Sequence, residues 1–227
     1  PSWSAAVWQA VFDSRSEAPD TINAIQRFNI YQELVCGMLY RLLRWIVGDL
    51  APDPWYFFRH SCYALNALGH VALVLLAASV GGGGGAVSSG VLPGATMFLL
   101  LYLNRRNISR IHDVGLLNLR ENWAVPVIWI QVLCLHGLLA SHPKLGAPQK
   151  AVSRGWVWSF RLATIVCLLL WQFSAFAFLL QVSAVFLCTL LSCSEGSRRA
   201  LEDVITSHLF ALGVALALLF GNELLLQ

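Results

Sequence analysis

Long apolar runs constrain this chain more than any other feature of its sequence. Residues 61–80 carry no Asp, Glu, Lys or Arg, and residues 156–193 carry a single charge, at Arg161. A membrane-spanning helix needs about 20 mostly apolar residues. The composition agrees, because 57% of the residues are hydrophobic and only 12% are charged, against roughly 25% charged residues in soluble domains. The sequence therefore predicts an all-α, polytopic membrane bundle and excludes most soluble folds.

Six membrane spans are predicted from these runs, with five as the alternative count. The run 156–193 would form a single helix about 57 Å long, nearly twice the roughly 30 Å thickness of the hydrocarbon core. We therefore expect two short helices within it, joined by a tight turn near Trp171, Gln172 and Phe173. The predicted spans are 61–80, 88–103, 123–140, two within 156–193, and 204–222.

The first 59 residues have a different pattern. Apolar residues recur at helical spacing over 28–47, with charged residues between them, and residues 4–13 show a weaker version. This pattern is typical of a helix that lies on the membrane surface rather than across it. We therefore divide the chain into a loop with amphipathic helices, 1–59, and a transmembrane bundle, 60–227. The glycine run 81–85 is interpreted as a flexible link, because it lacks the Lys and Ser or Thr of a phosphate-binding loop.

The richest polar segment is 104–122, which contains Arg105, Arg106, Arg110 and Arg120. Arginine suits phosphate because its planar guanidinium stays charged and donates two parallel hydrogen bonds. Beside a bilayer, such a segment suits a lipid phosphate or pyrophosphate headgroup. The alternative is that these arginines reach for the membrane surface without a specific ligand. Basic residues are nearly equal in number on the two sides of the predicted bundle, so their distribution does not fix its orientation.

Two further pairs of polar residues lie beside or within apolar runs. Arg120 and Glu121 precede a predicted span, where they form either a functional ion pair or a structural bridge at the helix start. Gln172 and Gln181 lie in apolar surroundings, where an unpaired amide costs several kcal/mol. We expect each amide to find a partner on another helix or on a bound polar ligand.

Other classes of function receive little support. The net charge of +3 is too small to indicate nucleic-acid binding, and most of the six cysteines lie in or beside apolar runs, where they act as small hydrophobes. His112 and Asp113 lack the further ligands that a metal site requires, and no cofactor is expected. The segment after Pro1 is not a signal peptide. The chain therefore reads as an internal piece of a longer membrane protein.

Four sequence blocks together suggest a family. The blocks are INAIQRFNIYQELVCGMLYRL (22–42), LRENWAVPVIWIQVL (119–133), LLLWQFSAFAFLLQVSAVFL (168–187) and FGNELLL (220–226). With these blocks the chain resembles the Dpy family of protein C-mannosyltransferases across nearly its whole length, and the blocks occur in the family's order. This resemblance implies a membrane bundle of the glycosyltransferase C type in the endoplasmic reticulum. It also implies transfer of mannose from dolichyl-phosphate mannose to C2 of tryptophan in secretory-pathway proteins, without a metal ion.

The resemblance also implies roles for particular residues. Arg120, and with it Arg110, would bind the phosphate of the donor lipid. Glu121, Trp171 and Gln172 would support the substrate site. None of the residues in this chain would act as the catalytic base, because the family's acidic residue is expected upstream of Pro1.

The resemblance finally implies an orientation and partners. Segments 1–59, 104–122 and the turn at Trp171 would face the lumen, and segments 141–155 and 194–203 the cytosol. The partners would be dolichyl-phosphate mannose, tryptophan-containing acceptor proteins and membrane lipid. The chain departs from the family in the second luminal loop, so the alternative function is a non-catalytic membrane scaffold or anchor of the same family.

Overall fold

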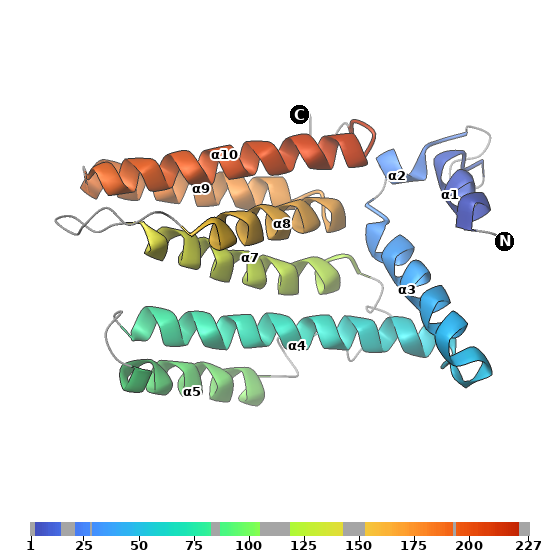
Figure 1. Cartoon of the computed structure of the whole chain (residues 1–227), viewed down its shortest axis with the longest axis horizontal. Helices are drawn as coiled ribbons and strands as arrows, with labels where there is room; N and C mark the ends of the chain where they lie inside the picture. Colours follow the sequence, from blue (N-terminus) through green and yellow to red (C-terminus); the bar gives the residue numbers. More distant parts are fainter. Residues whose placement is uncertain are drawn as a thin grey trace.

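Helices form all of the regular secondary structure in the described part of the chain. The computed structural model describes residues 3–14, 21–27, 29–82, 87–104, 119–142, 153–192 and 194–222. Figure 1 shows the long helices lying side by side in a bundle, with the three N-terminal helices gathered at one of its ends. The predicted all-α membrane bundle is confirmed by this architecture.

In the described part of the chain, six helices form the bundle, and each overlaps one of the six predicted runs. The tight turn predicted near Trp171 is confirmed. It occupies residues 171–173, between the helix that ends at Leu170 and the helix that begins at Ser174. Four of the described helices (α4, α7, α9 and α10) are long and apolar enough to cross a membrane, whereas α5 and α8 are shorter. The helices are α4 (Pro54–Gly81), α5 (Val87–Leu103), α7 (Glu121–Ser141), α8 (Arg154–Leu170), α9 (Ser174–Ser192) and α10 (Glu195–Leu218).

Helix α7 lies at the centre of the packing. It packs against α4 on one side and α8 on the other, α5 covers α4, and α10 packs against α8 and α9. About two-fifths of the most apolar part of α7 is buried inside the protein (39%), against 11% for α4. Large apolar side chains on α4, α5 and α9 point outward instead. Such an exposed apolar surface is what a bundle solvated by lipid requires.

Two of the three N-terminal helices, α1 (Trp3–Val11) and α3 (Tyr31–Val47), overlap the segments 4–13 and 28–47, and the short helix α2 (Ala24–Arg27) was not predicted. Helix α3 is followed by a 3-10 turn at Gly48–Leu50. Helix α3 meets the start of α4, where the rings of Tyr40 and Phe57 lie 5.5 Å apart. It leaves large apolar side chains exposed, among them Met38, Leu42, Trp45 and Ile46. That these side chains enter the membrane surface, and that residues 1–59 form a separate unit, stay predictions.

A proline near the start of α7 explains one bond between helices. Pro126 has no N–H, so the carbonyl oxygen of Asn122, four residues earlier, loses its partner within the helix. Asn66 on α4 supplies a replacement, since its Nδ2 donates to that oxygen at 2.9 Å and to the Cys62 oxygen at 2.9 Å. An unsatisfied carbonyl at membrane depth would cost several kcal/mol. This bond therefore ties α4 to α7.

The two glutamines predicted to need partners differ in their surroundings. Gln181 on α9 pairs reciprocally with Gln131 on α7, with N···O distances of 2.9 and 2.8 Å, and Gln131 also lies 3.4 Å from the Thr164 hydroxyl of α8. The prediction of an interhelical partner is thus confirmed for Gln181. Gln172 lies half-buried in the turn between α8 and α9. Among the described residues it has no side-chain hydrogen bond, so its expected partner is not found there.

Replacing Gln131 by leucine is expected to destabilise the protein by about 1–2 kcal/mol, because the half-buried Gln181 amide loses its partner. Replacing both glutamines by leucine should restore most of that loss, since no polar group is then left unpaired. Equilibrium unfolding of the purified protein in detergent measures both effects. Ser183→Ala is the control, since Ser183 is exposed and bonds only within α9. Equal losses in the single and double variants would refute the pairing argument.

Candidate functional site

Several chain segments meet at one end of the bundle, which we call the α3 end. Helices α4 and α7 begin there, α8 and α10 finish there, and α3 lies across it. In Figure 1 this end lies on the right, where α1, α2 and α3 are gathered. The N-terminal helices, the start of α7 at Arg120 and the turn at 171–173 therefore share one end. The sequence assigned these segments to the same side of the membrane.

Side chains of the N-terminal segment hold it against the ends of two bundle helices. Asn29 donates from Nδ2 to the carbonyl oxygens of Leu168 at 2.9 Å and Leu169 at 3.2 Å. The Tyr31 hydroxyl donates to the Leu218 oxygen at 2.6 Å. The last carbonyls of a helix lack partners within the helix, so these side chains satisfy groups that α8 and α10 leave open.

A second contact joins the same segment to the residues after α10. Asn222 donates from Nδ2 to the Gln26 carbonyl oxygen at 2.5 Å, and Gln26 donates from Nε2 to the Gly221 oxygen at 3.4 Å. Gly221 has a φ of 73°, a backbone conformation that favours glycine. At the α3 end, the sequence block 22–42 thus forms hydrogen bonds with the blocks 168–187 and 220–226.

Arg120 lies at the centre of this end, at the N-terminus of α7. It is half-buried, and its charge acts on Glu33 of α3. Desolvation raises the pKa of the Glu33 carboxyl, while its hydrogen bonds and the charge of Arg120 act in the opposite direction. Gln32 donates to Glu33 Oε1 at 3.1 Å. The α3 end therefore holds a partly buried cation with a carboxylate opposite it.

Some of the buried polar atoms without hydrogen-bond partners lie at this end. Among the described residues they are Asn29 Oδ1, Gln32 Oε1 and the indole nitrogen of Trp123, while the others belong to His142 and His208. Gln32 is 2% exposed and Trp123 is 5% exposed. Buried polar groups in proteins are nearly always paired, so these atoms mark places where a polar partner is expected. Sequence reasoning missed them, because burial at a helix end depends on which distant segment covers it.

The floor of the α3 end is apolar. Cys36, Cys62 and Trp123 belong to one buried cluster, and the ring of Phe58 lies 5.0 Å from that of Trp123. Burial and the nearby Glu33 charge raise the pKa of the Cys36 thiol to about 11. A thiol with this pKa stays protonated near neutral pH, and the thiolate is the reactive form. Nucleophilic catalysis by Cys36 is therefore not favoured.

The other residues to which the sequence analysis assigned a role differ in burial and in whether the structure describes them. Glu121 is exposed in the first turn of α7, where a carboxylate stabilises the helix terminus. In the described part of the structure, no ion pair joins Glu121 to Arg120. Trp171 is half-buried against the apolar cluster, and its ring lies 5.7 Å from that of Phe173. Arg110, with the rest of 105–118, lies outside the described residues. Within those residues, no three His, Cys, Asp or Glu side chains form a group suited to a metal ion.

Comparison with known proteins gives one consistent result. The family model Dpy19, described as Q-cell neuroblast polarisation, matches residues 1–227. The chain is 26% identical over 243 residues to protein C-mannosyl-transferase DPY19L1 of Mus musculus, covering 100% of this chain and 31% of the mouse protein. It is 26% identical over 249 residues to C-mannosyltransferase dpy-19 of Caenorhabditis elegans, covering 100% of this chain and 34% of the worm protein. Probable C-mannosyltransferase DPY19L4 of Homo sapiens is 24% identical over 226 residues, with 29% of its length covered. The chain thus spans about a third of the length of these curated relatives.

Proposed function

The chain belongs to the Dpy19 family, and from this premise we propose that it forms part of a membrane enzyme that transfers mannose to tryptophan. The donor is dolichyl-phosphate mannose, and the acceptor atom is C2 of the indole ring. The relatives that match are named as C-mannosyltransferases. The observation that carries the proposal is Arg120, a half-buried cation at a helix start, at the end of the bundle where Asn29, Gln32 and Trp123 also have buried polar atoms without hydrogen-bond partners.

The chemistry follows from the charges that change during transfer. The bond between mannosyl C1 and the phosphate oxygen breaks, and a bond between C1 and indole C2 forms. Negative charge therefore develops on the leaving dolichyl phosphate. Arg120 stabilises this charge, with Arg110 of the same loop as the second proposed phosphate ligand. Fixed charge directed at charge that develops in the transition state is usually the largest catalytic contribution.

The remaining steps need other residues. The proton on indole C2 passes to a carboxylate acting as general base, which we expect in the protein upstream of Pro1. Glu33 of α3 lies close enough to Arg120 for the two charges to interact. Glu121, Trp171 and Gln172 lie around the same end and support the substrates. Trp171 offers a half-buried aromatic face against the apolar cluster.

This mechanism requires a defined orientation in the membrane. The α3 end faces the lumen of the endoplasmic reticulum, where secretory proteins present their tryptophans, and the opposite end faces the cytosol. The exposed apolar side chains of α3 then enter the luminal leaflet. The headgroup of the donor lipid lies at the same level, beside Arg120.

The test is a transfer assay with the full-length protein that contains this chain. The purified protein is supplied with dolichyl-phosphate mannose and a peptide containing Trp-x-x-Trp, and the peptide is analysed by mass spectrometry. We expect the peptide to gain one hexose on a tryptophan, and to gain none when a nucleotide-linked mannose replaces the lipid donor. A folded protein that binds the peptide without transfer would instead support the scaffold alternative.

A further inference from the structure

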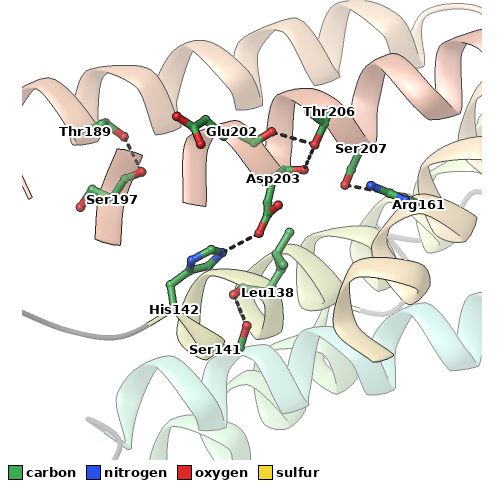
Figure 2. A network of polar contacts seen from close by, with 10 residues as sticks. All are labelled: Leu138, Ser141, His142, Arg161, Thr189, Ser197, Glu202, Asp203, Thr206 and Ser207. Carbon is green, nitrogen blue, oxygen red and sulfur yellow. Dashed lines mark hydrogen bonds and ion pairs between the residues drawn. The ribbon is translucent and has the colours of Figure 1, made fainter. Parts of the chain in front are cut away.

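Arg161 is a charged residue within the apolar part of α8, and the proposed transfer reaction does not use it. Its guanidinium carbon lies 5.1 Å from the ring centre of Trp158 and 5.1 Å from that of Phe210 on α10. Its Nε donates to the Ser207 hydroxyl at 3.3 Å. Figure 2 shows the bond that Arg161 makes across to Ser207 on α10. Two rings and one hydroxyl therefore fix the position of the guanidinium.

The charge of Arg161 is not neutralised by the protein around it. No carboxylate in the described part of the chain forms an ion pair with it. The nearby Asp203 carboxylate is directed to His142 of α7 instead, with an N···O distance of 3.3 Å. An ionised side chain within an apolar segment is costly and is normally paired or directed to water. The position of Arg161 therefore calls for an anion from outside the described chain.

The terminal N–H groups of Arg161 are accessible from the surface of the bundle. They make no hydrogen bond among the described residues. Since they are also absent from the buried atoms that lack partners, they are exposed at the surface. The two rings that cover the guanidinium lie on the outer surface, with Trp158 56% and Phe210 41% exposed. A guanidinium flanked by rings presents its edge, and the edge carries the donors that recognise phosphate.

Arg161 lies two helical turns, roughly 10 Å, from the start of α8. Asp203 and His142 mark a polar level, and Ser207 lies one helical turn, about 6 Å, beyond Asp203. Trp158 precedes Arg161 by a similar distance, and tryptophan is enriched at the membrane–water interface. Side chains on a helix lean toward its N-terminus, and α8 and α10 both begin at this end. The arginine side chain is thus directed toward the lipid headgroups.

We propose that Arg161 binds the phosphate of a membrane phospholipid, in the leaflet at the end of the bundle where α8 and α10 begin. The guanidinium edge holds the phosphate, while Trp158, Phe210 and Ser207 position the guanidinium. The acyl chains lie along the exposed apolar surface next to it, which includes Leu162 and Leu209. This site lies near the end opposite Arg120, and it does not depend on the mannosyl transfer reaction.

The test measures lipid binding to the full-length protein in detergent by native mass spectrometry. The probes are phosphatidylglycerol and a galactosyl diacylglycerol, which has the same acyl chains and no phosphate. We expect Arg161→Gln to weaken binding of one phosphatidylglycerol by about tenfold, the loss of one bidentate charged contact. Arg199→Gln removes the same charge from an exposed residue paired with Glu195, and it should bind as the unchanged protein does.

Each other outcome has a defined meaning. Equal binding of phosphatidylglycerol by a folded Arg161→Gln variant, or equal binding of the phosphate-free lipid by the unchanged protein, would overturn the proposal. Displacement of the lipid by millimolar inorganic phosphate would also overturn it, since it would indicate a site for free anions. If Arg161→Gln does not fold, Arg161→Lys replaces it, because lysine keeps the charge but loses the two parallel bonds. We then expect a loss of about threefold, and an unchanged affinity would count against the site.

Discussion

Replacing Arg120 by alanine in the full-length protein is expected to abolish mannosyl transfer, with kcat/KM lower by at least about 100-fold. The reason is the position of Arg120 at the N-terminus of α7, half-buried at the end of the bundle where Asn29, Gln32 and Trp123 have buried polar atoms without partners. In the proposed reaction its loss removes positive charge from the place where the leaving phosphate becomes negative. The measurement is the rate of hexose addition to a Trp-x-x-Trp peptide.

Two matched variants make this prediction specific. Arg120→Lys keeps the charge without the planar fork, so it should retain part of the activity. Arg154→Ala removes an exposed arginine at the opposite end of the bundle, and it should leave the rate unchanged. Undiminished transfer by Arg120→Ala would remove Arg120 from the donor site.

Replacing Gly69 by alanine is expected to destabilise the bundle, because the added methyl group meets the backbone of a neighbouring helix. A Cβ atom at Gly69 would lie 2.6 Å from Pro126 Cα and 2.7 Å from Pro126 Cβ. The obstacle includes backbone, so α4 and α7 must move apart, and such overpacking costs about 1–3 kcal/mol. Helix α7 is the central helix of the bundle, so the disturbance reaches its packing with α8 as well.

The control is a second helical glycine with open space around it. No atom lies within 4 Å of a Cβ built at Gly213 on α10, so Gly213→Ala should raise stability by up to about 1 kcal/mol through helix propensity. Thermal unfolding of both variants in detergent gives the comparison. If Gly69→Ala were as stable as Gly213→Ala, the close contact between α4 and α7 would be wrong.

Much of the fold could be predicted because apolar run length and helical periodicity are local properties. The turn at 171–173 followed from the thickness of a bilayer alone, since one helix through that run would be far too long. Helices α1 and α3 followed from the spacing of apolar residues in 4–13 and 28–47, whereas the short helix α2 was not predicted. These arguments use only neighbouring residues, which is why they succeed.

Contacts between distant segments could not be predicted in the same way. The need of Gln181 for a partner was clear from its apolar surroundings, but nothing local identifies Gln131 as that partner. Pro126 frees a carbonyl on α7, yet only the packing of α4 brings Asn66 to it. The contacts of Asn29 and Tyr31 with the ends of α8 and α10 likewise join residues more than a hundred positions apart.

The residues of the candidate site could likewise be predicted only in part from the sequence. The arginine-rich segment and the family resemblance pointed to Arg120, and the structure places that residue beside Glu33 and near buried polar groups of α3. Gln32 and Trp123 became candidates only once their burial was known. Gln172 was expected to need a buried partner, but as a turn residue it is half-exposed, because the helix ends there rather than continuing through the apolar run.

The central claim is that this chain belongs to an active C-mannosyltransferase whose donor site includes Arg120. The most direct test expresses the full-length protein, unchanged or with Arg120→Ala, in cells that lack C-mannosylation, together with a secreted acceptor that contains Trp-x-x-Trp. Fragment mass spectrometry then locates any added hexose. The account predicts a hexose bonded to the indole carbon with the unchanged protein and none with the variant. An unmodified acceptor beside normal amounts of the unchanged protein in the membrane would contradict it.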